Sequence, residues 1–226
     1  MIDMKTWTFS INSTRPELVA CGLGAPPVPL DFPTIKDLLL HLSAGKELPA
    51  GQIDNRLRAG ARAMQWHRCY TRLRAAPHFK AYRGSHFDAY KAAALARAAG
   101  TATPKQSILA DGLSGEIANS QVIVPEGQLV LHGRSDQNPS AGSVYDAYLS
   151  TTLSPFVARL SAIRRQNQLG GRATIYVFSV TRDLPAMWGH IGSSSEWELL
   201  FDAGLPVRTT DSLSAATFDI VEADLG

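Results

Sequence analysis

The sequence predicts an α+β protein, in which a mostly helical first half is followed by a compact, mainly antiparallel β region. Two observations favour this class. Apolar residues recur at helical spacing through much of residues 34–120, and after residue 126 the apolar runs become short, β-branched and aromatic, with turn residues between them. The chain has 226 residues, of which 45% are hydrophobic and 19% charged, so it can bury a sizeable core.

Helix signals divide the first half of the chain into four segments. Thr34 is a suitable N-cap for the first, and Gly45 and Gly100 are suitable stops for the first and third. The expected helices span 34–45, 51–76, 87–100 and 103–120. Residues 1–33 are rich in Pro and Gly, and we interpret them as an irregular arm with one strand at 5–11.

The second half alternates strand signals with a single helix. Ser154 and Pro155 begin that helix, because Ser caps an N-terminus and Pro fits the first helical position. We expect this helix over 154–167. The expected strands are 127–136, 144–153, 170–180, 197–201, 205–211 and 216–224.

Charge and cysteine content exclude several classes of function. A formal net charge of +2 gives no reason to expect nucleic acid or an anionic membrane as a partner. No apolar run approaches the length of a membrane span, and the N-terminus lacks a general secretory signal. Cys21 and Cys69 have no metal-binding spacing. Six Arg lie between Arg56 and Arg74 with no acid, which fits either a solvated helix face or a docking face for an acidic partner.

Three fragments of the β region carry residues suited to chemistry. In order along the chain, they are an Arg near a strand end (Arg134 in LVLHGRSD), the hydroxyl run Ser150-Thr151-Thr152, and the pair Glu196 and Glu198 around a Trp. Two carboxylates this close repel each other and are costly to desolvate, so a structural role alone explains them poorly.

In this order the fragments resemble the R-S-E class of mono-ADP-ribosyltransferases, the cholera-toxin-like and clostridial-toxin-like enzymes. The resemblance covers about residues 105–222. It implies an ADP-ribosyltransferase-like split β-sandwich core preceded by a helical N-terminal lobe. We therefore expect an N-terminal arm and helical lobe over 1–104, which could recognise a target, and a catalytic core over 105–226.

The resemblance also implies roles for the two glutamates. Cleavage of the bond between nicotinamide and ribose in NAD builds positive charge on the ribose, which a nearby carboxylate stabilises. Glu198 takes the position of the family's invariant Glu, which has that role. Glu196 takes the position of the variable Glu or Gln, which contacts the acceptor and can take its proton.

The NAD-binding residues follow from the same likeness. Ser150 resembles the Ser that supports the catalytic Glu, and Thr151 and Thr152 complete the hydroxyl strand. Arg134 would pair with the pyrophosphate. His132 shares a strand face with Arg134, and its Leu-His-Gly context is also similar to the poly-ADP-ribose polymerases.

The Arg is where this sequence departs from the family pattern. The family usually reads Tyr-Arg-Gly, which occurs here at 82–84, whereas the strand reads His132-Gly133-Arg134. We prefer Arg134, because it ends a clear strand before the Ser strand. Arg83 stays the alternative, and we expect it to open a helix.

The functional expectation is an NAD-dependent mono-ADP-ribosyltransferase that modifies a target protein, with NAD as co-substrate. Target candidates include a eukaryotic host protein such as ubiquitin or a GTPase, reached through a dedicated secretion system as for a bacterial effector or toxin acting in the cytosol. We expect a monomer, no metal and no membrane or nucleic-acid partner. A non-catalytic binding module and an NAD glycohydrolase toxin are the alternatives. Trp188 lies in the stretch that the family uses for substrate recognition.

Overall fold

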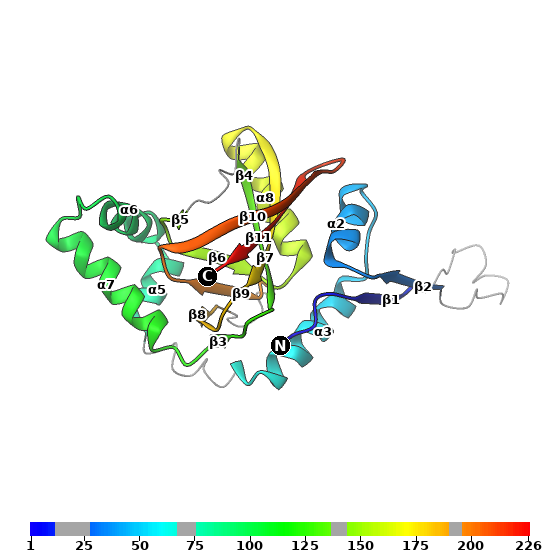
Figure 1. The fold of residues 1–226 in the computed structure, drawn as a ribbon, viewed down its shortest axis with the longest axis horizontal. Coiled ribbons are helices and arrows are strands. Elements are labelled where there is room, and N and C mark those ends of the chain that lie inside the picture. The colour runs from blue at the N-terminus through cyan, green and yellow to red at the C-terminus, as the bar shows by residue number, and fades with distance from the viewer. Residues whose placement is uncertain (12–27, 67–75, 137–143, 190–195) are drawn as a thin grey trace.

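The protein combines a curled nine-stranded sheet with helices and a small hairpin. The computed structural model describes residues 1–11, 28–66, 76–136, 144–189 and 196–226. In Figure 1 the sheet lies at the centre, with helices α5, α6 and α7 on one side and α2, α3 and the hairpin on the other. The predicted α+β class, with helices before the sheet, is confirmed.

The large sheet is mixed but mainly antiparallel. Its strand order is β3-β8-β9-β6-β4-β7-β11-β10-β5, and the β11–β7 pair is parallel. The strands are β3 (Ile123–Val124), β4 (Leu129–Asp136), β5 (Val144–Tyr145), β6 (Leu149–Thr152), β7 (Arg172–Val180), β8 (Leu184–Trp188), β9 (Glu198–Phe201), β10 (Leu205–Ser214) and β11 (Asp219–Leu225). Strands β4, β6 and β9 are therefore neighbours at the middle of the sheet, although 62 residues separate Asp136 from Glu198 in sequence.

Local sequence signals account for most of the helices. Thr34 and Thr103 each form a capping box, with Asp37 and Gln106, and Ser154 caps the helix that Pro155 begins. The helices are α2 (Ile35–Ser43), α3 (Ala50–Ala63), α5 (Pro77–Arg83), α6 (Phe87–Ala98), α7 (Pro104–Ala118) and α8 (Pro155–Leu169). None of these described helices is long and apolar enough to cross a membrane.

Four elements, one helix end and one strand break differ from the sequence expectations. Strand β3 was not expected, and helix α3 ends at Ala63 although we expected a helix over 51–76. Strand β2 (Val28–Phe32) pairs with β1 (Trp7–Ile11) in a two-stranded sheet, where we expected an irregular arm after the first strand. Helix α5 and strand β8 were not expected. The strand predicted at 144–153 is divided into β5 and β6, which pair with different neighbours.

The expectation for Arg83 is corrected by helix α5. Arg83 is the last residue of this short helix, and the Ala-rich helix α6 begins four residues later at Phe87. Gly84 separates the two helices as the C-cap of α5. Arg83 therefore ends one helix instead of opening the next. Cys21, Cys69 and the later half of the Arg-rich stretch lie outside the described residues.

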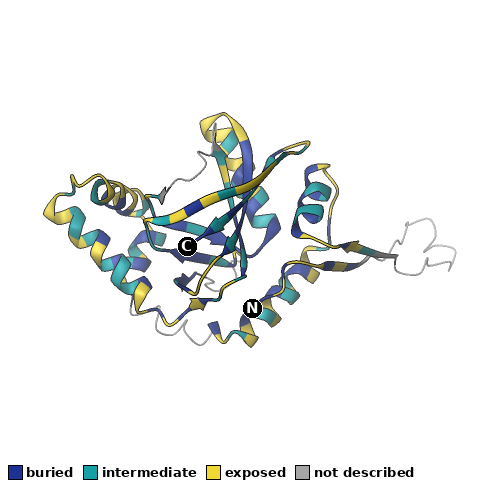
Figure 2. Ribbon diagram, viewed as in Figure 1, coloured by how far each residue is buried: buried dark blue, intermediate teal, exposed yellow. Residues whose placement is uncertain are grey.

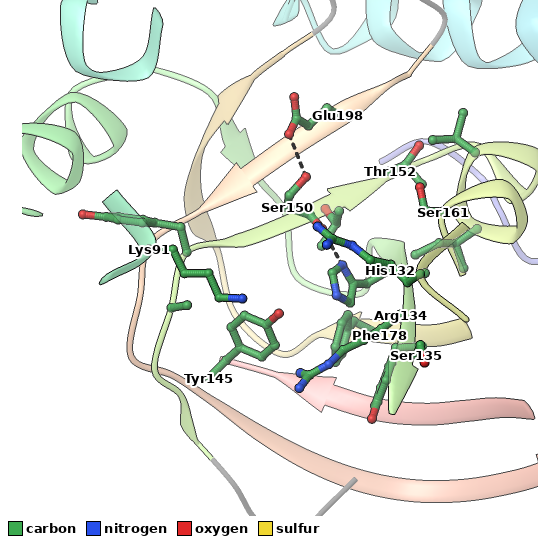
Figure 3. A pocket seen from close by; sticks show the side chains of 18 of the residues that line it. Lys91, His132, Arg134, Ser135, Tyr145, Ser150, Thr152, Ser161, Phe178 and Glu198 are labelled. Carbon is green, nitrogen blue, oxygen red and sulfur yellow. Dashed lines mark hydrogen bonds between the residues drawn. The ribbon is translucent and has the colours of Figure 1, made fainter. Parts of the chain in front are cut away.

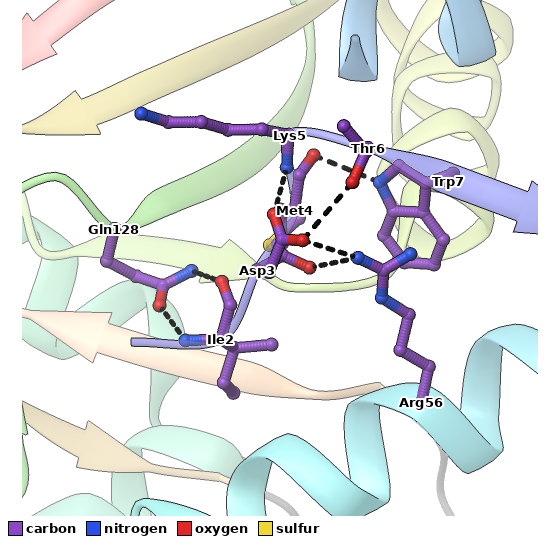
Figure 4. Close-up of polar contacts among 8 residues, drawn as sticks. All are labelled: Ile2, Asp3, Met4, Lys5, Thr6, Trp7, Arg56 and Gln128. Atoms are coloured by element: carbon purple, nitrogen blue, oxygen red, sulfur yellow. Dashed lines mark hydrogen bonds and ion pairs between the residues drawn. The ribbon is translucent and has the colours of Figure 1, made fainter. Parts of the chain in front are cut away.

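The N-terminal residues are held against the sheet by one buried amide. Gln128, fully buried before β4, accepts from Ile2 N at 2.8 Å and donates to Ile2 O at 3.1 Å (Figure 4). Arg56 of α3 pairs with Asp3 at 3.2 Å and lies 4.4 Å over the Trp7 ring. The first strand and α3 are thereby tied to each other and to the sheet.

One hydrophobic cluster runs through both halves of the chain. It joins buried residues of α2 and α3, such as Leu38 and Ile53, with those of β7, β9 and β11, such as Ile175, Leu199 and Ile220. Figure 2 shows the buried faces turned toward the middle of the molecule. The division into 1–104 and 105–226 stays a prediction.

Candidate functional site

A large cavity opens over the centre of the sheet, on the face that β4, β6 and β9 share. Its volume is about 1190 Å³, and it is lined from the strands and from helices α5, α6 and α8. All of the predicted site residues, from the three separate fragments of the sequence, line it: His132, Arg134, Ser150, Thr151, Thr152, Glu196 and Glu198. Figure 3 shows most of these side chains around the cavity. The sheet order therefore brings together what the sequence separates.

Glu198 and Ser150 form the polar centre of this cavity. The Ser150 hydroxyl donates to Oε1 of Glu198 at 2.6 Å across the β6–β9 pair (Figure 3). The other carboxylate oxygen, Oε2, is buried and makes no hydrogen bond among the described residues, but it forms an ion pair with Arg83, whose Nε lies 3.0 Å away. A carboxylate oxygen can accept more than one hydrogen bond, so Oε2 can also accept from a ligand hydroxyl.

His132 of strand β4 adds a further polar group to the cavity. Its Nδ1 lies 2.6 Å from the backbone oxygen of Ser150, which favours the tautomer with a proton on Nδ1. The ring also packs edge-on against Tyr145. His132 is thereby fixed beside Ser150.

The hydroxyls of the two threonines of β6 donate to backbone oxygens of the neighbouring segment. Thr151 is buried and donates its hydroxyl to Leu199 O at 2.9 Å. Thr152 donates to the backbone oxygen of Glu196 at 2.5 Å. Both hydroxyls are thus engaged with the segment that carries the glutamates.

Trp197 turns the chain sharply between the two glutamates. Its φ is +50°, in the left-handed region that bulky residues seldom adopt, and strand β9 begins only at Glu198. The alternation of side-chain direction along β9 therefore does not extend to Glu196. The Trp197 ring is buried against Trp188 and donates to Asp54 of α3 at 2.9 Å.

Arg83 lies against both glutamates. Its Nη2 is 2.8 Å from Oε2 of Glu196, and its Nε is 3.0 Å from Oε2 of Glu198. The guanidinium also donates to the backbone oxygen of Gly189. Arg134 lines the same cavity from β4, where its guanidinium lies 5.7 Å from the Tyr145 ring centre. The structure therefore brings both candidate Arg residues to one cavity.

The electrostatics of Glu198 reflect opposing effects. Burial raises the pKa of this carboxyl, Arg83 and the Ser150 hydrogen bond lower it, and Glu196 raises it, so the pKa stays above its ordinary value of 4.5. Burial also raises the pKa of the Tyr82 hydroxyl, which lines the cavity and stays protonated. No group of three or more potential metal ligands occurs among the described residues.

Sequence reasoning missed several groups at this cavity. Lys91 of α6 and Arg164 and Arg165 of α8 also line it. Gly189 supplies a close approach, because a Cβ there would lie 2.5 Å from Oε2 of Glu198. A glycine directly after an apolar run is the one signal that could have pointed to such a contact.

Comparison with known proteins identifies the fold. No family model and no curated protein matches this chain. Among solved structures, it is similar to the ADP-ribosyltransferase Vis in complex with an inhibitor, with a TM-score of 0.58 and 12% identity over 83% of this chain and 90% of that one.

Two further solved structures carry the same fold. The Vis toxin of Vibrio splendidus has a TM-score of 0.55 and 13% identity over 78% of this chain and 84% of its own. The ADP-ribosyltransferase toxin Plx2a of Paenibacillus larvae has a TM-score of 0.54 and 9% identity over 76% and 96%. The chain therefore has the fold of ADP-ribosyltransferase toxins, with a helical N-terminal part.

Proposed function

We propose that this chain is an NAD-dependent mono-ADP-ribosyltransferase, which transfers ADP-ribose from NAD to a side chain of a target protein and releases nicotinamide. The observation that carries the proposal is the Ser150–Glu198 hydrogen bond inside the large cavity, with a second carboxylate, Glu196, at its edge. The fold shared with ADP-ribosyltransferase toxins supports it.

Glu198 stabilises the developing positive charge on the ribose and accepts a hydrogen bond from a ribose hydroxyl. Its buried Oε2 pairs with Arg83 and keeps a lone pair that can accept from that hydroxyl, while Ser150 holds Oε1. A carboxylate that is already oriented costs no reorganisation when charge develops in the transition state. The bond to nicotinamide breaks, the acceptor atom bonds to the same ribose carbon, and the acceptor's proton leaves.

Glu196 serves the acceptor. Its side chain is 55% exposed, against 13% for Glu198, so an incoming side chain can reach it at the edge of the cavity. A carboxylate there can orient an acceptor or take its proton. The Vis toxin has been crystallised in complex with agmatine, a guanidinium compound, which makes agmatine a useful small acceptor to test here.

The NAD-binding groups come from β4 and β6. Arg134 provides a guanidinium for the pyrophosphate, and the imidazole of His132, which lines the cavity beside Ser150, contacts a ribose or the nicotinamide. Thr151 and Thr152 keep β6 against the glutamate segment through their hydroxyls. The target is a protein, for which ubiquitin and a GTPase are candidates, and delivery by a dedicated secretion system is part of the same proposal.

Incubation with NAD labelled in the adenylate part tests the function. A eukaryotic lysate and agmatine serve as acceptors, and Glu198→Gln is the control. Labelled protein or labelled agmatine would support the transferase. Free ADP-ribose alone would instead indicate an NAD glycohydrolase, and no turnover with any acceptor would indicate a binding module.

Glu196→Gln separates the two glutamates in the same assay. If Glu196 acts on the acceptor, transfer is lost while slow NAD hydrolysis continues. Equal loss of both activities would mean that Glu196 acts on NAD itself.

A further inference from the structure

The side chain of Arg83 makes three polar contacts. All three lie at the edge of the cavity that carries Glu196 and Glu198. It forms ion pairs with Glu196 and Glu198, at 2.8 and 3.0 Å, and donates to the backbone oxygen of Gly189. Among the described residues, Arg83 is the cation that forms ion pairs with both glutamates. Its side chain is 18% exposed and that of Glu198 13%, so water screens the Arg83–Glu198 pair poorly.

The backbone of Arg83 is fixed by the packing of helix α5. The two residues that anchor α5, Phe79 and Tyr82, are buried, and the Tyr82 ring packs against Phe87 and Tyr148. The carboxylate of Glu116 accepts from the first backbone N–H groups of α5, at 2.7 and 2.9 Å. Helix α5 therefore presents the guanidinium from a rigid support.

Without a cation between them, the carboxylates of Glu196 and of the buried Glu198 would repel each other. Removing a charge partner from a buried carboxylate leaves it uncompensated, which favours the protonated form. The Ser150 hydroxyl reaches Oε1 of Glu198 alone, whereas Arg83 reaches Oε2 and also Glu196. A single guanidinium, that of Arg83, thus pairs with both carboxylates.

We propose that Arg83 is a positioning residue, whose guanidinium holds Glu198 ionised and fixes Glu196 and the backbone of Gly189 around it. The inference rests on the proposed function, which assigns the chemistry to the glutamates. It differs from the alternative in which Arg83 binds the pyrophosphate of NAD. A phosphate ligand would change the KM for NAD, whereas a positioning residue changes kcat and the pH at which activity is lost.

The test begins with Arg83→Gln, Arg83→Lys and a matched control. Arg172→Gln removes another Arg that is paired with a carboxylate, Asp219 at 2.6 Å, but it lies outside the cavity. Carbon-13 NMR of the glutamate carboxyl groups, without NAD, follows the titration of Glu198. Its signal is identified by its loss in Glu198→Gln.

We expect the Glu198 midpoint to rise by about one pH unit or more in Arg83→Gln, since a neighbouring cation lowers a carboxyl pKa by that order. Arg83→Lys should give a smaller rise, because an ammonium lacks the planar fork that reaches three acceptors. Arg172→Gln should leave the midpoint unchanged. An unchanged midpoint in a folded Arg83→Gln would overturn the proposal.

Kinetics of NAD hydrolysis give the second measurement. We expect kcat to fall at least tenfold in Arg83→Gln and the acid limb to move to higher pH, with partial recovery in Arg83→Lys. A raised KM for NAD with an unmoved acid limb would instead identify a phosphate ligand and overturn the proposal. If the wild-type protein turns over no NAD, the proposed function fails while the NMR titration still decides the role of Arg83. Should Arg83→Gln fail to fold, Arg83→Lys carries both measurements.

Discussion

At the scale of single residues, the site depends on a buried carboxyl that must be charged to act. Burial makes the ionised form of Glu198 costly, and the contacts from Arg83 and Ser150 offset this cost in part. The net result is that the pKa of the Glu198 carboxyl is raised. This carboxyl therefore favours folding below its ordinary pKa of 4.5, and that contribution is lost as pH rises through the folded pKa.

The pH dependence of NAD hydrolysis should follow from this shift. Because the ionised carboxylate is the active form, kcat should fall by half at a pH above 4.5, the ordinary value for Glu. Initial rates between about pH 4 and pH 8 measure the midpoint on the acid side. A midpoint at or below the ordinary value would contradict the burial of Glu198 in the active protein.

The absence of a side chain at Gly189 makes room for Glu198. A Cβ at this position would lie 2.5 Å from Oε2 and 3.2 Å from Cδ of Glu198. We therefore expect Gly189→Ala to displace the carboxylate and to lower NAD turnover at least tenfold, as small misplacements of reacting groups do. Rates and a thermal melt of Gly189→Ala are compared with Gly51→Ala, whose Cβ meets no atom within 4 Å. Turnover equal to that of Gly51→Ala would show that the contact is unimportant.

At the scale of elements, helix α8 approaches strand β4 unusually closely. Gly133 stands between His132 and Arg134 on this strand. A Cβ on Gly133 would lie 1.9 Å from Ala158 O and 2.7 Å from Ala162 N, both backbone atoms of α8. The glycine therefore lets the helix pack directly on the strand, and its two neighbours His132 and Arg134 line the cavity.

Gly133→Ala should force these two elements apart. Because the clash is with backbone atoms, relief requires a shift of α8, and we expect the free energy of unfolding to fall by about 1–3 kcal/mol. Gly115→Ala in helix α7 is the matched control, since its Cβ meets no atom within 4 Å. That control should be neutral or raise stability by about 0.5–1 kcal/mol. Urea denaturation measures both, and equal stabilities would contradict the close approach.

The elements also show which features a sequence can predict. Two capped helices and the β-branched strand β7 were predicted because their signals are local, in Thr34, Ser154 and the run of 172–180. Helix α5 has only seven residues, too few for helical periodicity to be visible. Strand β2 contains Pro29, which argues against a strand except at an edge, and the hairpin has such edges.

The residues of the site also differ in whether a local sequence signal predicts them. Ser150, Glu196 and Glu198 follow from motifs within strands and their ends, and the sheet order then brings them to one cavity. The contact of Arg83 with the glutamates spans more than 110 residues and depends on how α5 packs against the sheet. Sequence reasoning could leave Arg83 as an alternative to Arg134 but had no signal for its position.

At the scale of the whole molecule, the helical part and the sheet meet directly behind the site. Asp54 of α3 accepts from the indole of Trp197, the residue between the two glutamates. Trp197 is 1% exposed and packs against Trp188, which in turn packs against Trp66. Lys36 of α2 joins the far side of the sheet through Asp211 at 2.5 Å. The N-terminal helices therefore contribute to the support of the site.

The Asp54–Trp197 contact makes this coupling measurable. Trp197→Phe retains an aromatic ring but removes the indole donor, and we expect the free energy of unfolding to fall by roughly 1 kcal/mol or more. Asp54→Ala should cost a similar amount, and the double variant less than the sum, because both single variants break one hydrogen bond. Urea denaturation of the four proteins gives the coupling energy.

NAD turnover of the same four proteins tests whether that contact serves the site. Trp197 has a φ of +50°, a conformation that surrounding contacts must maintain. Loss of its anchor on α3 should let the turn relax and draw Glu196 away from Arg83, so transfer to an acceptor should fall more than NAD hydrolysis does. Asp88→Ala, in the first turn of α6, provides a control that removes an acid from another helix. Additive stabilities together with unchanged transfer would mean that α3 packs on the sheet without supporting its chemistry.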